Sequence, residues 1–132
     1  GLLLTEAFYW DLNDETRAFA KRFAEKFNGK MPTSPQAGVY ASALHYLNAI
    51  KDAKTKDATK VMAQMRATPI NDPLFGKGEV RIDGRAIHPM YLFEVKKPAD
   101  SKGPWDIYRL VATIPAEEAF RPLADGNCPL VK

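Results

Sequence analysis

The sequence predicts an α/β fold in which three helices are followed by a small set of β-strands. Two observations indicate this class. Up to Ala67, apolar residues recur at helical spacing in three segments, each bounded by capping residues or proline. Beyond Gly78, they gather instead in short extended runs separated by turn residues. With 132 residues and a hydrophobic content of 45%, the chain is long enough to bury the core of one domain.

Three helices are predicted from their caps and periodicity. The first begins after Asp11-Leu12-Asn13 and ends at Asn28-Gly29. The second begins at Ser34-Pro35 and runs to about Ala53, and the third covers about residues 56–67. The residues predicted to face inward are Phe19, Phe23 and Phe27 in the first helix, Val39, Ala43, Tyr46, Leu47 and Ile50 in the second, and Val61, Met62 and Met65 in the third.

Short strands are predicted at both ends of the chain. An apolar strand covers residues 2–4, and residues 79–82 and 85–87 flank Asp83-Gly84, a dipeptide typical of hairpin turns. Two stronger strands follow at residues 90–95 and 105–114, and residues 115–120 form one helical turn before an irregular tail.

The best internal boundary lies where helical spacing gives way to extended runs. Residues 71–73 and 76–78 have the proline, glycine and polar composition of loops. The chain is therefore divided into residues 1–70 and residues 71–132.

No motif for catalysis, a metal or a cofactor is recognised, so we expect neither an enzyme nor a cofactor-binding protein. The two histidines have no metal-ligand spacing, and Gly76 and Gly78 lack the remaining residues of a nucleotide loop. Cys128 is the only cysteine and has no histidine near it in sequence, so we interpret it as inert. The net charge is +3 without a clustered basic stripe, which argues against a nucleic-acid partner.

Phe8, Tyr9 and Trp10 are three consecutive aromatic residues between the first strand and the first helix. They can pack under the following helix, which is the ordinary arrangement. They can also line a cleft, because ligand pockets favour aromatic walls. The residues by themselves leave both possibilities open. The chain starts with a strand and without methionine, so we expect it to be an internal piece of a longer chain.

The order of several segments resembles the C-terminal portion of periplasmic solute-binding proteins of ABC transporters, of the leucine/isoleucine/valine-binding type. The resemblance covers essentially the whole chain and depends on order and spacing rather than on any catalytic signature. The segments that carry it are residues 5–19 (TEAFYWDLNDETRAF), 31–33 (MPT), 36–40 (QAGVY), 78–85 (GEVRIDGR), 88–98 (HPMYLFEVKKP), 103–106 (GPWD) and 128–132 (CPLVK).

The resemblance implies part of a type I periplasmic-binding-protein fold, in which two α/β lobes are joined by three crossover strands and close on a solute by hinge bending. Residues 1–70 would hold the second crossover and helices of the first lobe. Residues 71–132 would hold the third crossover and a β segment of the second lobe with the C-terminal tail. The implied partners are a small solute, an ABC permease in the membrane and the missing N-terminal part of the same protein, and the implied location is the periplasm.

Ligand-binding residues are carried over from the family by position. Residues after the crossover strand and at the start of the next lobe-one helix reach the cleft between the lobes. The solute would be a branched-chain or hydrophobic amino acid, or a small aromatic carboxylate. The corresponding positions in this chain are Phe8, Tyr9, Trp10, Gln36 and Tyr40.

The main alternative is a self-contained small α/β interaction domain with no transport role. An enzyme fragment with the same lobe fold is disfavoured by the missing motifs. If the sheets are incomplete, we expect exposed strand edges around residues 2–4 and 90–95, and such edges pair with other chains. An oligomer or a tightly bound partner fragment is therefore expected.

Overall fold

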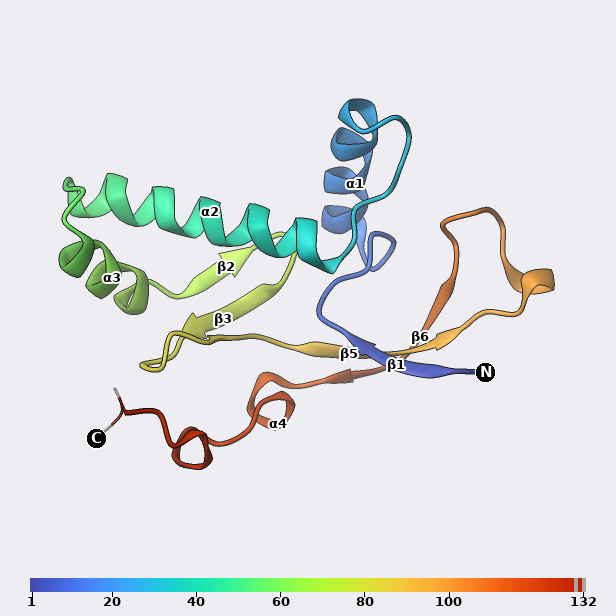
Figure 1. The fold of residues 1–132 in the computed structure, drawn as a ribbon. Helices are drawn as coiled ribbons and strands as arrows, with labels where there is room; N and C mark the ends of the chain where they lie inside the picture. Colours follow the sequence, from blue (N-terminus) through green and yellow to red (C-terminus); the bar gives the residue numbers. More distant parts are fainter. Residues whose placement is uncertain (130, 132) are drawn as a thin grey trace.

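The computed structural model describes residues 1–129 and 131, and it has the expected order of three helices followed by short strands (Figure 1). Leu130 and Lys132, in the predicted tail, lie outside the described residues. The elements are β1 (Leu3–Glu6), α1 (Asp14–Lys26), α2 (Ser34–Ala53), α3 (Ala58–Ala67), β2 (Ile70–Asp72), β3 (Gly76–Val80), β4 (Ala86–Ile87), β5 (Met90–Val95), β6 (Tyr108–Ile114) and α4 (Ala116–Ala119), with 3-10 turns at Pro98–Asp100 and Leu123–Gly126.

The first long helix begins and ends where its sequence signals predict. The Asn13 side chain accepts a hydrogen bond from the Thr16 N–H at 2.9 Å, and the Thr16 hydroxyl accepts one from the Asn13 N–H at 3.0 Å. This reciprocal pair satisfies amides that the first helical turn leaves unpaired. After the helix, Asn28 and Gly29 adopt the left-handed conformation, with φ of 52° and 75°.

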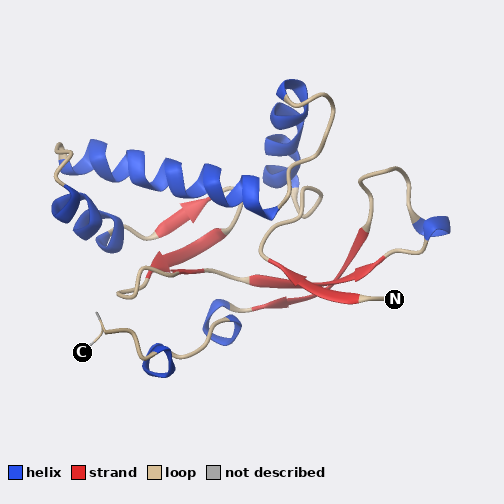
Figure 2. Cartoon of the chain, in the orientation of Figure 1, coloured by secondary structure: helices blue, strands red, loops and turns tan. Residues whose placement is uncertain are grey.

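The strands form two antiparallel sheets of three strands each, in the orders β1-β5-β6 and β2-β3-β4 (Figure 2). The pairing Leu3 with Glu94 joins the start of the chain to its later part. The expectation of a free edge at residues 90–95 is wrong, because β5 is the central strand of its sheet. Among the described residues, the unpaired edges of this sheet belong to β1 and β6. Sequence composition indicated a strand at 90–95 but held no information on its neighbours.

Residues 71–73 and 76–78 were predicted as loops, and this prediction is wrong for most of them. They belong largely to β2 and β3, which pair in the register Asn71 with Lys77. The reason is a tight turn: one Asp72 carboxylate oxygen accepts hydrogen bonds from the N–H groups of Leu74 and Phe75, at 2.7 and 2.9 Å. The polar and glycine residues that resembled a loop therefore close a hairpin.

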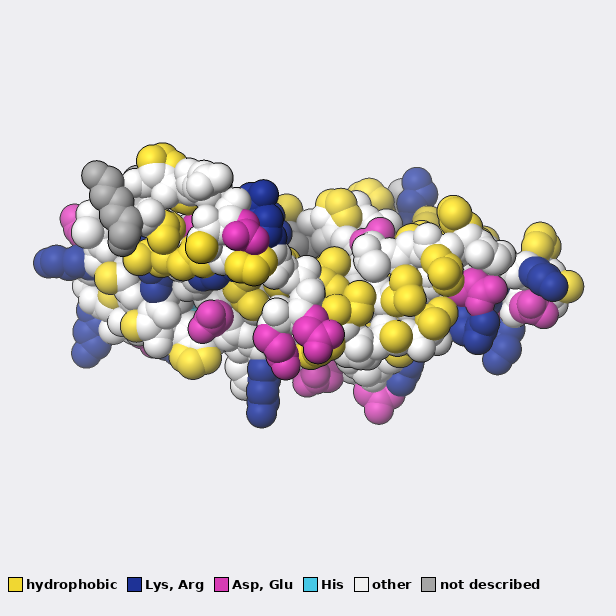
Figure 3. Space-filling view, turned by 90° about the horizontal axis from the view of Figure 1, so that it is seen from below, with side chains coloured by type: hydrophobic (Ala, Val, Ile, Leu, Met, Phe, Trp, Pro, Cys, Tyr) yellow, Lys and Arg dark blue, Asp and Glu magenta, His cyan; other side chains and the backbone are white. Residues whose placement is uncertain are grey.

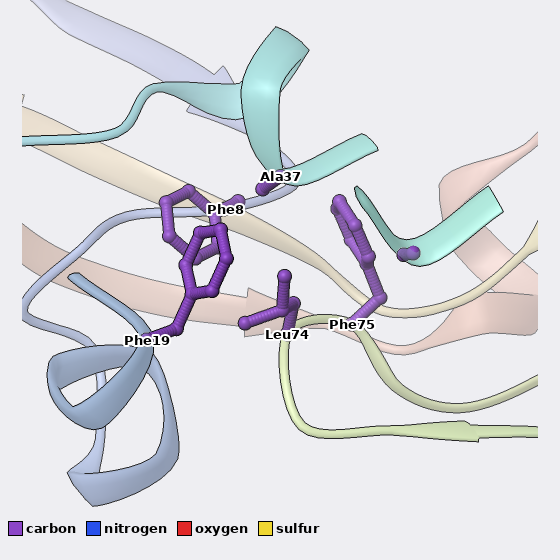
Figure 4. Close-up of a cluster of buried hydrophobic side chains, with 6 residues drawn as sticks. Phe8, Phe19, Ala37, Leu74 and Phe75 are labelled. Carbon is purple, nitrogen blue, oxygen red and sulfur yellow. The ribbon is translucent and has the colours of Figure 1, made fainter. Parts of the chain in front are cut away.

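The main core cluster lies where the β1–α1 link, α1, α2 and the β2–β3 turn meet (Figure 4). Phe8 is 2% exposed, and its ring meets Phe19 edge-on with the ring centroids 6.1 Å apart. Leu74, also 2% exposed, belongs to the same cluster. Segments far apart in sequence are thus joined by one set of aromatic and aliphatic contacts.

The predicted inward face of α2 is wrong within the described chain. Val39 and Leu47 are 70% and 59% exposed, whereas the buried residues of this helix are Ala37, Ala41 and Ala49. Their small side chains let the helix approach the hairpin and α1 closely. Of the periodic apolar face, Val39, Tyr46 and Leu47 are exposed among residues 1–129 and 131, and Ile50 is half-buried.

The other predicted inward faces are confirmed only in part. Phe19 is buried, but Phe27 at the end of α1 is 51% exposed. In α3, Val61 is buried and Met62 and Met65 are half-buried. Hydrophobic side chains also reach the surface in several patches on the side of the molecule opposite α2 (Figure 3). Within the described part of the chain, no helix has the length and apolar character needed to cross a bilayer.

Candidate functional site

Tyr9 and Trp10, two of the three consecutive aromatic residues, form hydrogen bonds with the backbone of residues 105–108, at the start of β6. The Tyr9 hydroxyl donates to the Trp105 carbonyl oxygen at 3.0 Å and accepts from the N–H groups of Ile107 and Tyr108, at 3.2 and 3.4 Å. The Trp10 indole N–H donates to the same Trp105 carbonyl at 2.8 Å. The β1–α1 link and residues 105–108 are therefore fixed to each other, although more than 90 positions separate them in sequence.

The Tyr9 ring belongs to a second aromatic cluster, on the β1-β5-β6 sheet. Its centroid lies 5.5 Å from that of Phe93 and 5.3 Å from that of Tyr108. Burial of the phenol raises the pKa of Tyr9 above its ordinary value, against the opposing effect of the two backbone N–H donors. The hydroxyl is thus a neutral hydrogen-bonding group at physiological pH.

A hollow of about 140 Å³ lies beside the three aromatic residues. Its walls come from Glu6 on β1, the aromatic link, residues 31–33 before α2, Ser34 at the start of α2, and Trp105, Ile107 and Tyr108. The Ser34 hydroxyl donates to a Glu6 carboxylate oxygen at 2.5 Å and lies 3.2 Å from the Phe8 carbonyl oxygen. This contact fixes the start of α2 against the end of β1.

A larger hollow of about 330 Å³ adjoins the first, and Trp10, Met31 and Trp105 line both. The rest of its lining is the loop dipeptide Gly103-Pro104 and four charged residues, Asp11, Lys96, Lys102 and Asp106. The two hollows therefore combine indole and thioether surface with carboxylates and ammonium groups.

The loop that forms the far wall of the larger hollow is held by its own ion pair. The Lys96 ammonium donates to Asp106, and the Lys102 N–H donates to the other oxygen of that carboxylate at 2.9 Å. These bonds, the one from Lys96 first, lower the pKa of Asp106, and Asp106 in turn raises the pKa of Lys96. Both groups are charged across the physiological range.

The structure brings together only three of the five predicted ligand-binding residues. Phe8, Tyr9 and Trp10 line the 140 Å³ hollow, although Phe8 and Tyr9 are 2% and 7% exposed and belong mainly to the aromatic clusters. Trp10 has the more accessible ring. Both arrangements that the sequence left open, packing and lining a hollow, therefore occur in one segment.

Gln36 and Tyr40 lie elsewhere, at a hollow of about 490 Å³ between α1 and α2. The Gln36 side chain accepts a hydrogen bond from the Thr33 N–H at 3.0 Å, which caps the helix start. The Tyr40 ring packs against Phe19, with the centroids 4.9 Å apart.

Sequence reasoning missed Met31 and Trp105 as lining residues. Trp105 gave a usable signal, because a large aromatic residue directly follows the loop dipeptide Gly103-Pro104. Met31 gave none. Among the described residues, no group of three or more histidine, cysteine, aspartate or glutamate side chains is placed to hold a metal ion.

The sequence of residues 1–103 matches the model of the family described as periplasmic binding protein. The chain therefore belongs to the periplasmic binding protein family, as its resemblance implied. No protein of curated function is matched by the sequence.

Several solved structures, among them periplasmic binding proteins, are similar to this chain. The chain is 47% identical to a periplasmic binding protein from Burkholderia mallei, with a TM-score of 0.94 over 100% of this chain and 35% of that one. It is 46% identical to a branched-chain amino acid ABC transporter periplasmic ligand-binding protein from Burkholderia xenovorans, with the same TM-score and coverage. An ABC-type branched-chain amino acid transporter protein from Rhodopseudomonas palustris is 28% identical, with a TM-score of 0.75, 93% of this chain and 33% of that one.

The chain thus spans about a third of the length of these solved relatives. Its fold is part of the periplasmic-binding-protein fold.

Proposed function

We propose that the chain is the C-terminal part of a periplasmic solute receptor of an ABC importer. The solute is a branched-chain or other hydrophobic amino acid, or a small aromatic carboxylate. The observation that carries this proposal is the position of Trp10: its indole lines two adjoining hollows and is anchored by a 2.8 Å hydrogen bond to Trp105. The indole therefore supplies an apolar surface for a solute, and the chain belongs to the periplasmic binding protein family.

The chemistry around Trp10 suits a zwitterion with an apolar side chain. Asp11 and Lys102 add both signs of charge to the apolar surface of Met31 and Trp105. Tyr9 and Phe8 would support the wall from behind, since they are nearly inaccessible. Gln36 and Tyr40, at the start of α2, would contact the solute only from another side of a closed cleft.

The exposed apolar surface supports a further part of the proposal. The face of α2 that contains Val39 and Leu47 would be covered by the rest of the same receptor, and the open edges of β1 and β6 would be paired there or in a homo-oligomer. The complete protein would present its closed form to an ABC permease and would contain no catalytic site. Residues 1–70 and 71–132 would contribute to different lobes.

Solute binding is tested by thermal unfolding of the complete protein against a panel of hydrophobic amino acids and aromatic carboxylates. We expect a member of the panel to raise the unfolding temperature, because a ligand that binds only the folded state stabilises it. Trp10→Ala should reduce this shift, whereas Phe27→Ala, which changes an exposed ring that lines neither hollow at Trp10, should not. No shift with any member would reject the solute class.

The alternative, a self-contained interaction domain, is tested at the exposed face of α2. Leu47 is 59% exposed here, so in such a domain Leu47→Ala should change the free energy of unfolding by less than about 0.5 kcal/mol. In a complete receptor that covers this face, the same change should cost roughly 2–3 kcal/mol. Lys51→Ala on the same helix is the control, and urea unfolding supplies the measurement.

A further inference from the structure

A hollow of about 600 Å³ lies between the β3–β4 turn and the C-terminal tail, away from the aromatic link. The residues that matter for its chemistry are Arg81, Asp83 and Arg85 from the turn, and Phe120, Arg121 and Cys128 from the tail. Three arginine residues and one aspartate are an unusual set around a concave surface, because like charges that lie close together repel each other unless they meet anions.

Arg81 and Asp83 neutralise each other. The Arg81 guanidinium donates to the two Asp83 carboxylate oxygens at 3.0 and 2.7 Å, a two-point pairing that matches the geometry of both groups. The Arg85 N–H donates to the same carboxylate at 3.3 Å. The hydrogen bond from Arg81 is the main cause that lowers the pKa of Asp83 to about 2. The carboxylate is therefore engaged within the turn.

Arg85 and Arg121 supply the remaining charge. The Arg85 guanidinium carbon lies 5.4 Å from the centroid of the Phe120 ring, which holds the side chain against the tail. Arg81 also donates to the Arg121 carbonyl oxygen at 3.0 Å and so ties the tail to the turn. Among residues 1–129 and 131, neither Arg85 nor Arg121 forms an ion pair.

We propose that this hollow binds a small anion with at least two acidic groups, such as a di- or tricarboxylate or a phosphate ester. Its volume is in the usual range for small-ligand sites. The Arg85 and Arg121 guanidinium groups each bind one acidic group of the ligand, because planar guanidinium donors match carboxylate and phosphate oxygens. The site is separate from the hollows at Trp10 and does not depend on the proposed solute.

The test is a calorimetric titration of the complete protein with citrate at constant ionic strength. We expect saturable binding and a loss of affinity of about tenfold in each of Arg85→Gln and Arg121→Gln, since each removes one charge-assisted contact. Arg22→Gln, on the exposed surface of α1, makes the same change in net charge and should leave the affinity unchanged. Far-ultraviolet circular dichroism checks that all variants are folded.

The proposal is overturned by any of three results. The first is that citrate does not bind saturably up to roughly 10 mM. The second is that Arg85→Gln or Arg121→Gln leaves the affinity for citrate unchanged. The third is that Arg22→Gln weakens binding as much as these two variants do. The last result would show attraction by net charge rather than by a site.

Discussion

The Tyr9 hydroxyl joins the β1–α1 link to the start of β6, and its removal has a calculable effect. In Tyr9→Phe the ring still packs against Phe93, but the Ile107 and Tyr108 N–H groups lose their acceptor, at 3.2 and 3.4 Å. The Trp105 carbonyl loses one donor at 3.0 Å and keeps the bond from Trp10 at 2.8 Å. The carbonyl therefore stays satisfied, whereas the two amides do not.

An unsatisfied donor costs about 1–3 kcal/mol when buried and less when water can reach it. Because these amides are only partly buried, we expect a total loss of about 2 kcal/mol, which corresponds to roughly 30-fold faster hydrogen exchange. The direct assay is amide hydrogen exchange at Ile107 and Tyr108, followed by nuclear magnetic resonance or mass spectrometry. Tyr46→Phe is the control, because Tyr46 is exposed and its hydroxyl forms no hydrogen bond among the described residues.

Unchanged exchange at both amides in Tyr9→Phe would refute this reasoning. Equal acceleration across the whole protein would also refute it, because the effect would then be global destabilisation rather than loss of a local link. A further signature is available at high pH. Since burial raises the pKa of Tyr9, folding favours the neutral phenol, and protection at these amides should fall as the pH rises above about 10.

Two further predictions concern the β3–β4 hairpin. In Gly78→Ala, the new methyl group would lie 2.1 Å from a backbone carbonyl oxygen of β4, so we expect a loss of about 2 kcal/mol or more in urea unfolding. Gly38→Ala, in an open position inside α2, should instead stabilise the protein by roughly 0.5–1 kcal/mol. If both variants lose the same stability, the close contact at Gly78 is not the cause of its loss. The second prediction is a pH dependence from Asp83, whose pKa falls from 3.8 to about 2 on folding. As the pH falls, the unfolded state takes up the proton first, so the contribution of Asp83 to stability should be lost between about pH 4 and pH 2. Asp83→Asn should abolish this pH dependence. If the free energy of unfolding of the variant depends on pH in the same way as that of the original protein, the ion pair is not its source.

Local sequence signals predicted the starts and ends of helices well. Asn13, Pro35 and Gly29 act on their own turn of the chain, and the capping bonds they predict require no distant residue. The strand at residues 90–95 was predicted for the same reason, since its apolar run is continuous.

Predictions that depend on distant partners were less successful. The β2–β3 hairpin was missed because its residues resemble a loop until Asp72 closes the turn. The candidate site was found in part: the aromatic link was evident from composition, whereas Met31 and Trp105 joined it only through folding.

The sequence by itself determined the α/β class, the three helices, the periplasmic-binding-protein resemblance and the run of three aromatic residues Phe8-Tyr9-Trp10. Tertiary structure decided which rings are buried, that Trp10 alone of the three lines both hollows, and that β5 is the central strand of its sheet. It also decided that alanines, not the periodic apolar residues of α2, face the core of this chain. The physical reason is that caps and periodicity act within a few residues, whereas burial depends on which surfaces a distant segment brings against them.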